Sequence, residues 1–138
     1  MKILVAHDGS EQANKALREA ATIAGKTGGV LNIVTVVPDL CLMEVSDNEC
    51  KTITESLFSD AKGSMKKVAD EIAARGIKAE ILTKEGHPAE RIIETIRETG
   101  ADMVVVGAHG KHGAKKFLLG SVSSKVVEHA PCHVLVIK

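Results

Sequence analysis

The stretch VVVGAHGKHGAKKFLLGSVSSKVV, from Val104 to Val127, combines a run of valines, a glycine-rich loop and the serine-rich start of a helix. Four of the chain's twelve glycines fall in it, at positions 107, 110, 113 and 120. Glycine is entropically costly in a folded chain, so a cluster of it needs a physical reason. A strand followed by such a loop and a helix is typical of an α/β fold in which another group closely approaches the loop backbone.

Apolar segments recur along the whole chain and predict five strands: Ile3–Ala6, Val30–Val37, Ile77–Leu82, Met103–Val106 and Val134–Ile137. The first and the last two are continuous rather than alternating. Continuous apolar runs are typical of strands that are buried on both faces of a parallel sheet.

Helical patterns lie between these segments. The first, with Ser10 as N-cap, has a stripe of small and apolar residues: Ala13, Ala16, Leu17, Ala20, Ala21 and Ala24. The second carries apolar residues at three- and four-residue steps from Ile53 to Ile72; the third runs from Pro88 to Gly100, and the fourth from Gly120-Ser121 to just before Pro131. This order predicts one α/β domain over residues 1–138, with helices on both faces of a parallel sheet and right-handed crossovers. We expect a loop from Pro38 to Cys50.

Composition excludes several classes of function. Lysine plus arginine and aspartate plus glutamate both number 18, so we expect no nucleic-acid partner, which would need a basic face. No apolar run approaches the roughly 20 residues of a membrane span, and the four apolar residues near the N-terminus are too few for a signal peptide. The three cysteines fit no metal or redox spacing. We expect a cytoplasmic protein with reduced thiols.

Ligands of open parallel sheets bind at the carboxyl ends of the strands. Two turns are candidates, His7–Ser10 and the glycine cluster. The cluster matches neither G-x-G-x-x-G nor the P-loop, and the GKT fragment at residues 25–27 is interpreted as the end of a helix. A turn at Gly107 and Gly110, together with a helix opening at Gly120-Ser121, would suit a polyphosphate bound by backbone N–H groups. The alternative is a flexible loop with an ordinary serine cap.

Three pieces of sequence carry a family resemblance: ILVAHDGS at the N-terminus, GAHGKHG, and LLGSVSSKVVEHAPCHVLVIK at the C-terminus. The spacing G-x-x-G-x9-G-[ST] is met by Gly107, Gly110, Gly120 and Ser121. Over its whole length the chain resembles the ATP-binding branch of the universal stress protein family. The resemblance implies a five-stranded sheet in the order 3-2-1-4-5, a Rossmann-like, adenine nucleotide alpha hydrolase-like fold.

The resemblance also implies a site for ATP and Mg. Asp8 would lie near the ribose or the metal, Ala6 would line the adenine, and Val36 would offer its backbone to adenine. The phosphates would be held by five residues, with His109 and Lys111 nearby: Gly107, Gly110, Gly120, Ser121 and Val122. From the residues alone, Ala6 and Val36 are equally explained as strand core, and Asp8 as an Asx-type cap. His7 receives no role.

The resemblance implies a regulatory, stress-response ATP-binding module rather than an enzyme. No arginine lies within the motif to stabilise phosphoryl transfer. A slow ATPase, autophosphorylation at Ser121 or Ser123, and a nucleotide-free interaction module remain alternatives. His109 and His112 lack further ligands for a metal site. The apolar last strand, Val134–Ile137, predicts pairing with a second copy, and a homodimer through this edge is common in the family.

Overall fold

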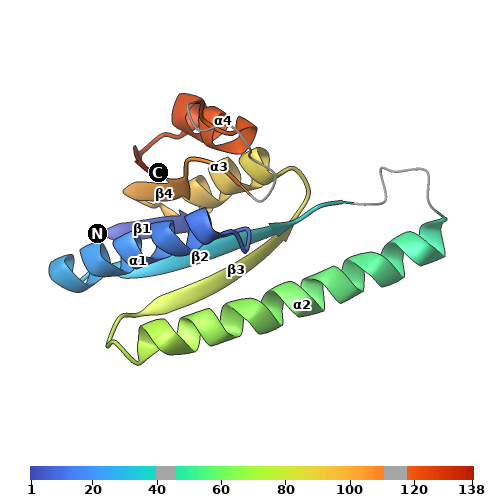
Figure 1. Cartoon of the computed structure of the whole chain (residues 1–138), viewed down its shortest axis with the longest axis horizontal. Helices are drawn as coiled ribbons and strands as arrows, with labels where there is room; N and C mark the ends of the chain where they lie inside the picture. Colours follow the sequence, from blue (N-terminus) through green and yellow to red (C-terminus); the bar gives the residue numbers. More distant parts are fainter. Residues whose placement is uncertain (40–45, 111–117) are drawn as a thin grey trace.

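The computed structural model describes residues 1–39, 46–110 and 118–138. Within them five strands alternate with four helices: β1 (Lys2–Ala6), α1 (Glu11–Thr27), β2 (Val30–Val37), α2 (Asp47–Ala73), β3 (Ala79–Glu85), α3 (Pro88–Thr99), β4 (Met103–Gly107), α4 (Ser121–His129) and β5 (His133–Ile137). All strand pairs are parallel, and the strands form one sheet in the order β3-β2-β1-β4-β5 (Figure 1). The expected strand order is confirmed.

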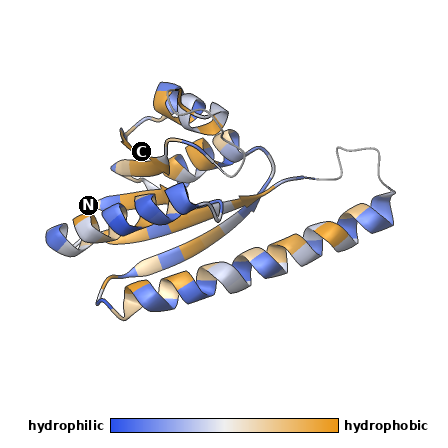
Figure 2. Ribbon diagram, viewed as in Figure 1, coloured by the Kyte–Doolittle hydropathy of each residue, from blue (hydrophilic) through white to orange (hydrophobic). Residues whose placement is uncertain are grey.

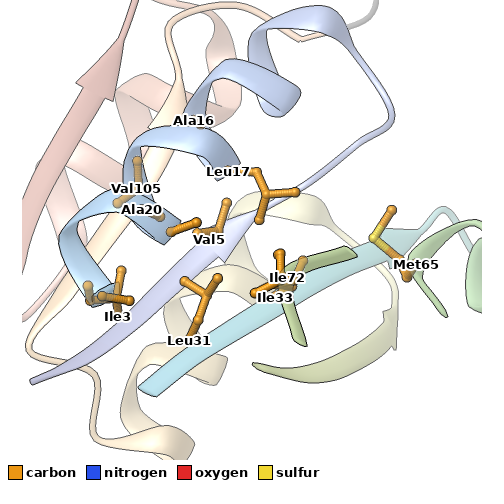
Figure 3. Packing of buried hydrophobic residues seen from close by; sticks show 12 residues of the cluster. Ile3, Val5, Ala16, Leu17, Ala20, Leu31, Ile33, Met65, Ile72 and Val105 are labelled. Atoms are coloured by element: carbon orange, nitrogen blue, oxygen red, sulfur yellow. The ribbon is translucent and has the colours of Figure 1, made fainter. Parts of the chain in front are cut away.

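The sheet has a hydrophobic core on each face. On one face, Ile3 and Val5 of β1 pack with residues of α1 and α2, including Met65 and Ile72 (Figure 3). On the other face, the core joins Leu4 to residues of α3 and α4: Ile92, Ile96 and Val126. Successive residues of a strand point to opposite faces. The central strand β1 is therefore apolar at every buried position, which explains its continuous apolar run.

Helix α1 follows its sequence signals closely. Ser10 caps it by accepting a hydrogen bond from the Ala13 amide, and Gly28 ends it in the left-handed conformation. Its buried residues are the six of the predicted stripe. Because five of them are alanines, the helix lies close to the sheet, with its hydrophilic turns outward (Figure 2).

Three sequence expectations need correction. β3 begins at Ala79 rather than Ile77 and continues to Glu85, because an edge strand tolerates polar residues. Lys84, for example, pairs with Glu98 of α3 at 2.6 Å. Helix α2 begins at Asp47, inside the segment expected to be a loop, and the Ser46 hydroxyl donates to the Glu49 carboxylate at 2.8 Å. Cys50 is disulfide-bonded, so the expectation of reduced thiols was wrong for it, whereas Cys132 is free.

Helix α2 is much longer than the strand that it flanks. Its 27 residues span about 40 Å, whereas the seven residues of β3 span about 23 Å. The amino-terminal part of α2 consequently extends past the end of the sheet (Figure 1). In the described residues no helix is both long and apolar enough to cross a membrane.

Candidate functional site

The turn between β1 and α1 is held by side-chain to backbone hydrogen bonds. The Ser10 amide donates to Asp8 Oδ1 at 2.9 Å, and the Gly9 amide donates to His7 Nδ1 at 3.2 Å. Gly9 has φ +82°, a conformation that side chains disfavour. Because both amides have partners inside the protein, this turn presents a carboxylate rather than free N–H groups. The Asx-type role of Asp8 is thus present, although Ser10 is the helix cap.

The end of β4 and the start of α4 are fastened together across the intervening segment. The Gly120 amide donates to the Ala108 carbonyl at 2.8 Å, and the buried Ser123 hydroxyl donates to the Gly107 carbonyl at 2.7 Å. The ring Nε2 of His109 bonds to the Leu118 carbonyl. The helix opening is therefore set directly beside the end of the strand.

None of the three described glycines of the motif has a positive φ, so backbone conformation does not require them, and space inside the protein explains two of them. A Cβ atom at Gly107 would lie 2.9 Å from the Gln12 Cβ atom, so this glycine lets α1 pack against β4. A Cβ atom at Gly110 would lie 2.9 Å from Asp8 Oδ2. At Gly120 the nearest atom, the Ala108 carbonyl oxygen, would be 3.4 Å away, an ordinary contact.

The proximity of Asp8 to the main chain of Gly110 joins the two turns that the sequence singled out. The carboxylate of the first turn lies against the main chain of the second, although the residues are about a hundred positions apart. The predicted metal or ribose ligand and the predicted phosphate loop therefore meet at one place on the carboxyl edge of the sheet.

The opening of α4 provides free backbone donors at this place. Its N-cap residue, Gly120, has no side chain to accept a hydrogen bond, and the first intrahelical bond is from Ser124 to Gly120. Within the described chain, the N–H groups of Ser121 and Val122 are left without a partner. Free N–H groups and the positive end of the helix dipole favour an anion. The Gly120 amide already donates to the Ala108 carbonyl, so Gly120 can help to bind a phosphate only by leaving space for it.

The carboxyl end of β2 presents a donor and an acceptor. Residues of β2 bond alternately to its two neighbours: Val30 and Val34 bond toward β1, whereas Leu31 and Val37 bond toward β3. By this alternation Val36 directs its N–H and C=O toward the β1 side. β1 ends at Ala6, and the last bond of that ladder is from the His7 amide to Val34, so the polar groups of Val36 face past the end of β1.

The structure thus brings most of the predicted site together. Ala6, half-buried, ends β1 beside this edge. Asp8 Oδ2 fills the space where a side chain at Gly110 would begin, and Gly120, Ser121 and Val122 open α4. Gly107 is accounted for by α1, and His109 is bonded within its own segment. Lys111 lies outside the described residues, as does His112.

Sequence reasoning missed three features of the site. His7 is buried under the turn, and Ser123 fastens β4 to α4. The side-chain oxygen of Gln12 is buried and has no hydrogen-bond partner among the described residues. The sequence does place Ser123 two residues after the glycine–serine pair. A single sequence does not show, however, that Ser123 rather than Ser124 bonds to β4.

A separate hollow lies beside α2. A volume of about 750 Å³ separates the amino-terminal half of α2 from the end of β3, and residues such as Lys51, Phe58, Lys62 and Glu85 line it. It mixes acidic and basic side chains around one aromatic ring. No sequence motif pointed to it, and it does not include the two joined turns.

The described residues hold no cluster of three or more metal-ligating side chains. A metal at this edge would therefore bind largely through a ligand's own oxygens. Away from the edge, burial raises the pKa of the Cys132 thiol, with a smaller contribution from the charge of Asp102. That cysteine has the character of a packing residue rather than a nucleophile.

Comparison with known proteins agrees with this architecture. The model of the universal stress protein family matches residues 1–138. The chain belongs to this family. It is 31% identical to universal stress protein YxiE of Bacillus subtilis, over 99% of this chain and 98% of that protein. Universal stress protein UspA from Lactobacillus plantarum has a TM-score of 0.90 and 28% identity, covering 100% of this chain and 97% of that one.

Two universal stress proteins of known structure were solved with adenine nucleotides. One, in complex with cAMP, covers 99% of this chain and 95% of its own, and the other, from Archaeoglobus fulgidus in complex with dAMP, covers 100% and 98%. Each has a TM-score of 0.68 and 25% identity to this chain. The shared architecture therefore accommodates adenine nucleotides in these relatives.

Proposed function

We propose that this universal stress protein domain is a regulatory module that binds Mg-ATP across the carboxyl ends of β1 and β4. The observation that carries the proposal is the opening of α4. There, the amides of Ser121 and Val122 have no partner among the described residues, and the cap residue Gly120 lies against Ala108 and His109, just before the Gly110 main chain that faces Asp8. The nucleotides bound by the relatives of known structure support the same ligand class.

The phosphates would lie between the opening of α4 and the Gly110 turn. Backbone N–H groups recognise phosphate without any lysine or arginine. The Ser121 side chain is exposed and its hydroxyl can add a donor, whereas that of Ser123 is already bonded within the protein. The space beside Gly120 would accommodate a phosphate oxygen. Gly107 and His109 would hold the loop next to the phosphates in place. Lys111 would lie near the phosphates.

The residues present fit a magnesium ion. Magnesium in nucleotide sites is commonly bound by one or two carboxylates together with phosphate oxygens and water. Asp8 supplies one such carboxylate at this edge. When bound, the ion would neutralise phosphate charge, and Asp8 would hold it at the turn.

The adenine would lie at the end of β2. Its Watson–Crick edge has an amine donor beside a ring-nitrogen acceptor, and Val36 offers the complementary C=O and N–H on one residue. Ala6 and the Val36 side chain would supply apolar contact. Guanine presents the opposite order of donor and acceptor, so this edge favours adenine.

We favour binding and signalling over catalysis. Ser123, one of the two residues considered for autophosphorylation, is 5% exposed and donates its hydroxyl to a carbonyl, so it is poorly placed to attack a phosphate. The motif lacks an arginine that could stabilise phosphoryl transfer. A regulatory role requires only that nucleotide binding changes a surface seen by a partner.

We also propose that the module is a homodimer through β5. This strand forms one edge of the sheet, and its apolar residues are only half-buried. A second β5 would satisfy the open edge. Light scattering should give twice the mass of one chain, and a strict monomer at high concentration would contradict this part.

Calorimetry with Mg-ATP and Mg-GTP tests the nucleotide proposal. We expect an affinity near micromolar for Mg-ATP, about 8 kcal/mol, and much weaker binding of Mg-GTP. Equal affinity for the two would contradict the role of Val36. Single-turnover release of labelled phosphate that is abolished by Asp8→Ala would favour an ATPase instead.

A further inference from the structure

His7 lies beneath the turn that carries Asp8, and both of its ring nitrogens have partners. Nε2 is 2.9 Å from Asn14 Oδ1 in α1, and Nδ1 accepts a hydrogen bond from the Gly9 amide at 3.2 Å. The residue is 5% exposed, and its own amide donates to the Val34 carbonyl at 2.9 Å. The ring is therefore a fixed part of the turn.

The partners determine the tautomer. The Gly9 N–H can only donate, so Nδ1 must be the unprotonated nitrogen. In a neutral imidazole Nε2 then carries the hydrogen, and it needs the acceptor that Asn14 Oδ1 provides. The ring thus performs two distinct tasks: it accepts from the turn at one nitrogen and anchors to α1 at the other.

The accepted bond acts on the conformation of Asp8. Gly9 follows Asp8 and has φ +82°, and the next amide, that of Ser10, bonds to Asp8 Oδ1. The two peptide groups after Asp8 are therefore both fixed by side chains. With Oδ1 engaged in the turn, Oδ2 is directed to the main chain at Gly110, the place where the two halves of the proposed site meet.

We propose that His7 is a positioning residue. Through Nδ1 it holds the Gly9 peptide, so that the Asp8 carboxylate is oriented toward the metal before the nucleotide binds. This inference rests on the proposed binding of Mg-ATP. A carboxylate that is already oriented lowers the entropic cost of binding. A more mobile turn at Asp8 should therefore weaken the part of the ATP affinity that depends on magnesium.

Two substitutions separate the two nitrogens. An asparagine oxygen lies about where Nδ1 lies and can accept from the amide two residues on, as in an Asx turn. A glutamine amide reaches about as far as Nε2 and can donate to Asn14 but not accept from Gly9. His7→Asn and His7→Gln each remove one hydrogen bond of the ring, and His7→Leu removes both.

The experiment measures ATP affinity with magnesium and with EDTA for each variant. We expect His7→Gln and His7→Leu to lose about tenfold in affinity with magnesium and little in EDTA. His7→Asn should recover most of the loss. Thr95→Val is a matched control for stability, because it removes a buried hydroxyl that donates to the Arg91 carbonyl within α3, away from the turn. Its ratio of ATP affinity with magnesium to ATP affinity in EDTA should match that of the wild type.

Equal losses in His7→Asn and His7→Gln, or losses that persist in EDTA, would overturn the positioning role and leave a merely structural histidine. Hydrogen exchange of the Gly9 amide gives a readout without nucleotide: its protection should fall in His7→Gln and return in His7→Asn. A wild-type protein that binds no ATP but shows this exchange pattern would refute the proposed function while leaving the turn mechanism standing. Unchanged Gly9 protection in all variants would refute the turn mechanism itself.

Discussion

Replacing Gly107 by alanine should destabilise the fold even though no ligand is involved. The added Cβ atom would lie 2.9 Å from the Cβ atom of Gln12 and 3.2 Å from its carbonyl carbon. Carbon atoms in contact normally lie about 3.5–4.0 Å apart. Because the carbonyl carbon belongs to the helix backbone, relief requires α1 to move away from β4.

The magnitude follows from two opposing effects. Overpacking of this kind costs about 1–3 kcal/mol, and the loss of chain entropy in the unfolded state returns about 0.4–1 kcal/mol. The free energy of unfolding should therefore fall by about 1–2 kcal/mol. With a urea m-value of about 2 kcal/mol/M, the midpoint falls by about 0.5–1 M.

Urea unfolding followed by circular dichroism measures this change. Gly63→Ala in α2 is the matched control, since beyond the helix's own backbone no atom of the described residues lies within 4 Å of its added Cβ atom, and the residue is inside a helix. It should raise the free energy of unfolding by about 0.5–1 kcal/mol. A Gly107→Ala protein as stable as the wild type, with ATP binding abolished, would show that the glycine serves the ligand and would refute the packing explanation.

Three further predictions concern neighbouring positions. Gly120→Ala meets only ordinary contacts, so its stability should stay within about 1 kcal/mol of the wild type while ATP affinity falls about tenfold on calorimetry; unchanged affinity would place the phosphates elsewhere. Ser123→Ala leaves the Gly107 carbonyl without its hydroxyl donor and should cost about 1–3 kcal/mol in urea unfolding, whereas a cost near zero would mean that the bond is replaced by water. Because burial raises the pKa of Cys132, its thiolate fraction at pH 8 is below that of an exposed cysteine, and its reaction with a disulfide reagent should be slower in the native protein than in denaturant; equal rates would contradict this.

The fold was largely predictable because its signals are local. The alanine stripe of α1, the cap at Ser10 and the glycine after α3 each depend on residues a few positions apart, and all three are confirmed. One error arose where tertiary surroundings decide, and another where a local signal was overlooked. The polar end of β3 is a strand because it pairs with β2, and an S-x-x-E pattern at Ser46 that starts α2 was overlooked.

The site was predictable in place but less so in detail. The sequence singled out both turns, yet it could not show that Gly107 faces Gln12 whereas Gly110 faces Asp8. The sequence alone does not show whether a motif glycine leaves space for a helix, for a carboxylate or for a ligand. The buried state of His7 also depends on Asn14 and Val34, which no spacing rule connects to it.

Amide chemical shifts during a titration with Mg-ATP test the central claim most directly, because each candidate surface has its own reporters. The proposal predicts that the largest shift changes occur at Val36, at the carboxyl end of β2, and at Ser121 and Val122, at the opening of α4. Changes confined to residues such as Lys51 and Phe58, which line the hollow beside α2, or no changes at millimolar nucleotide, would contradict it.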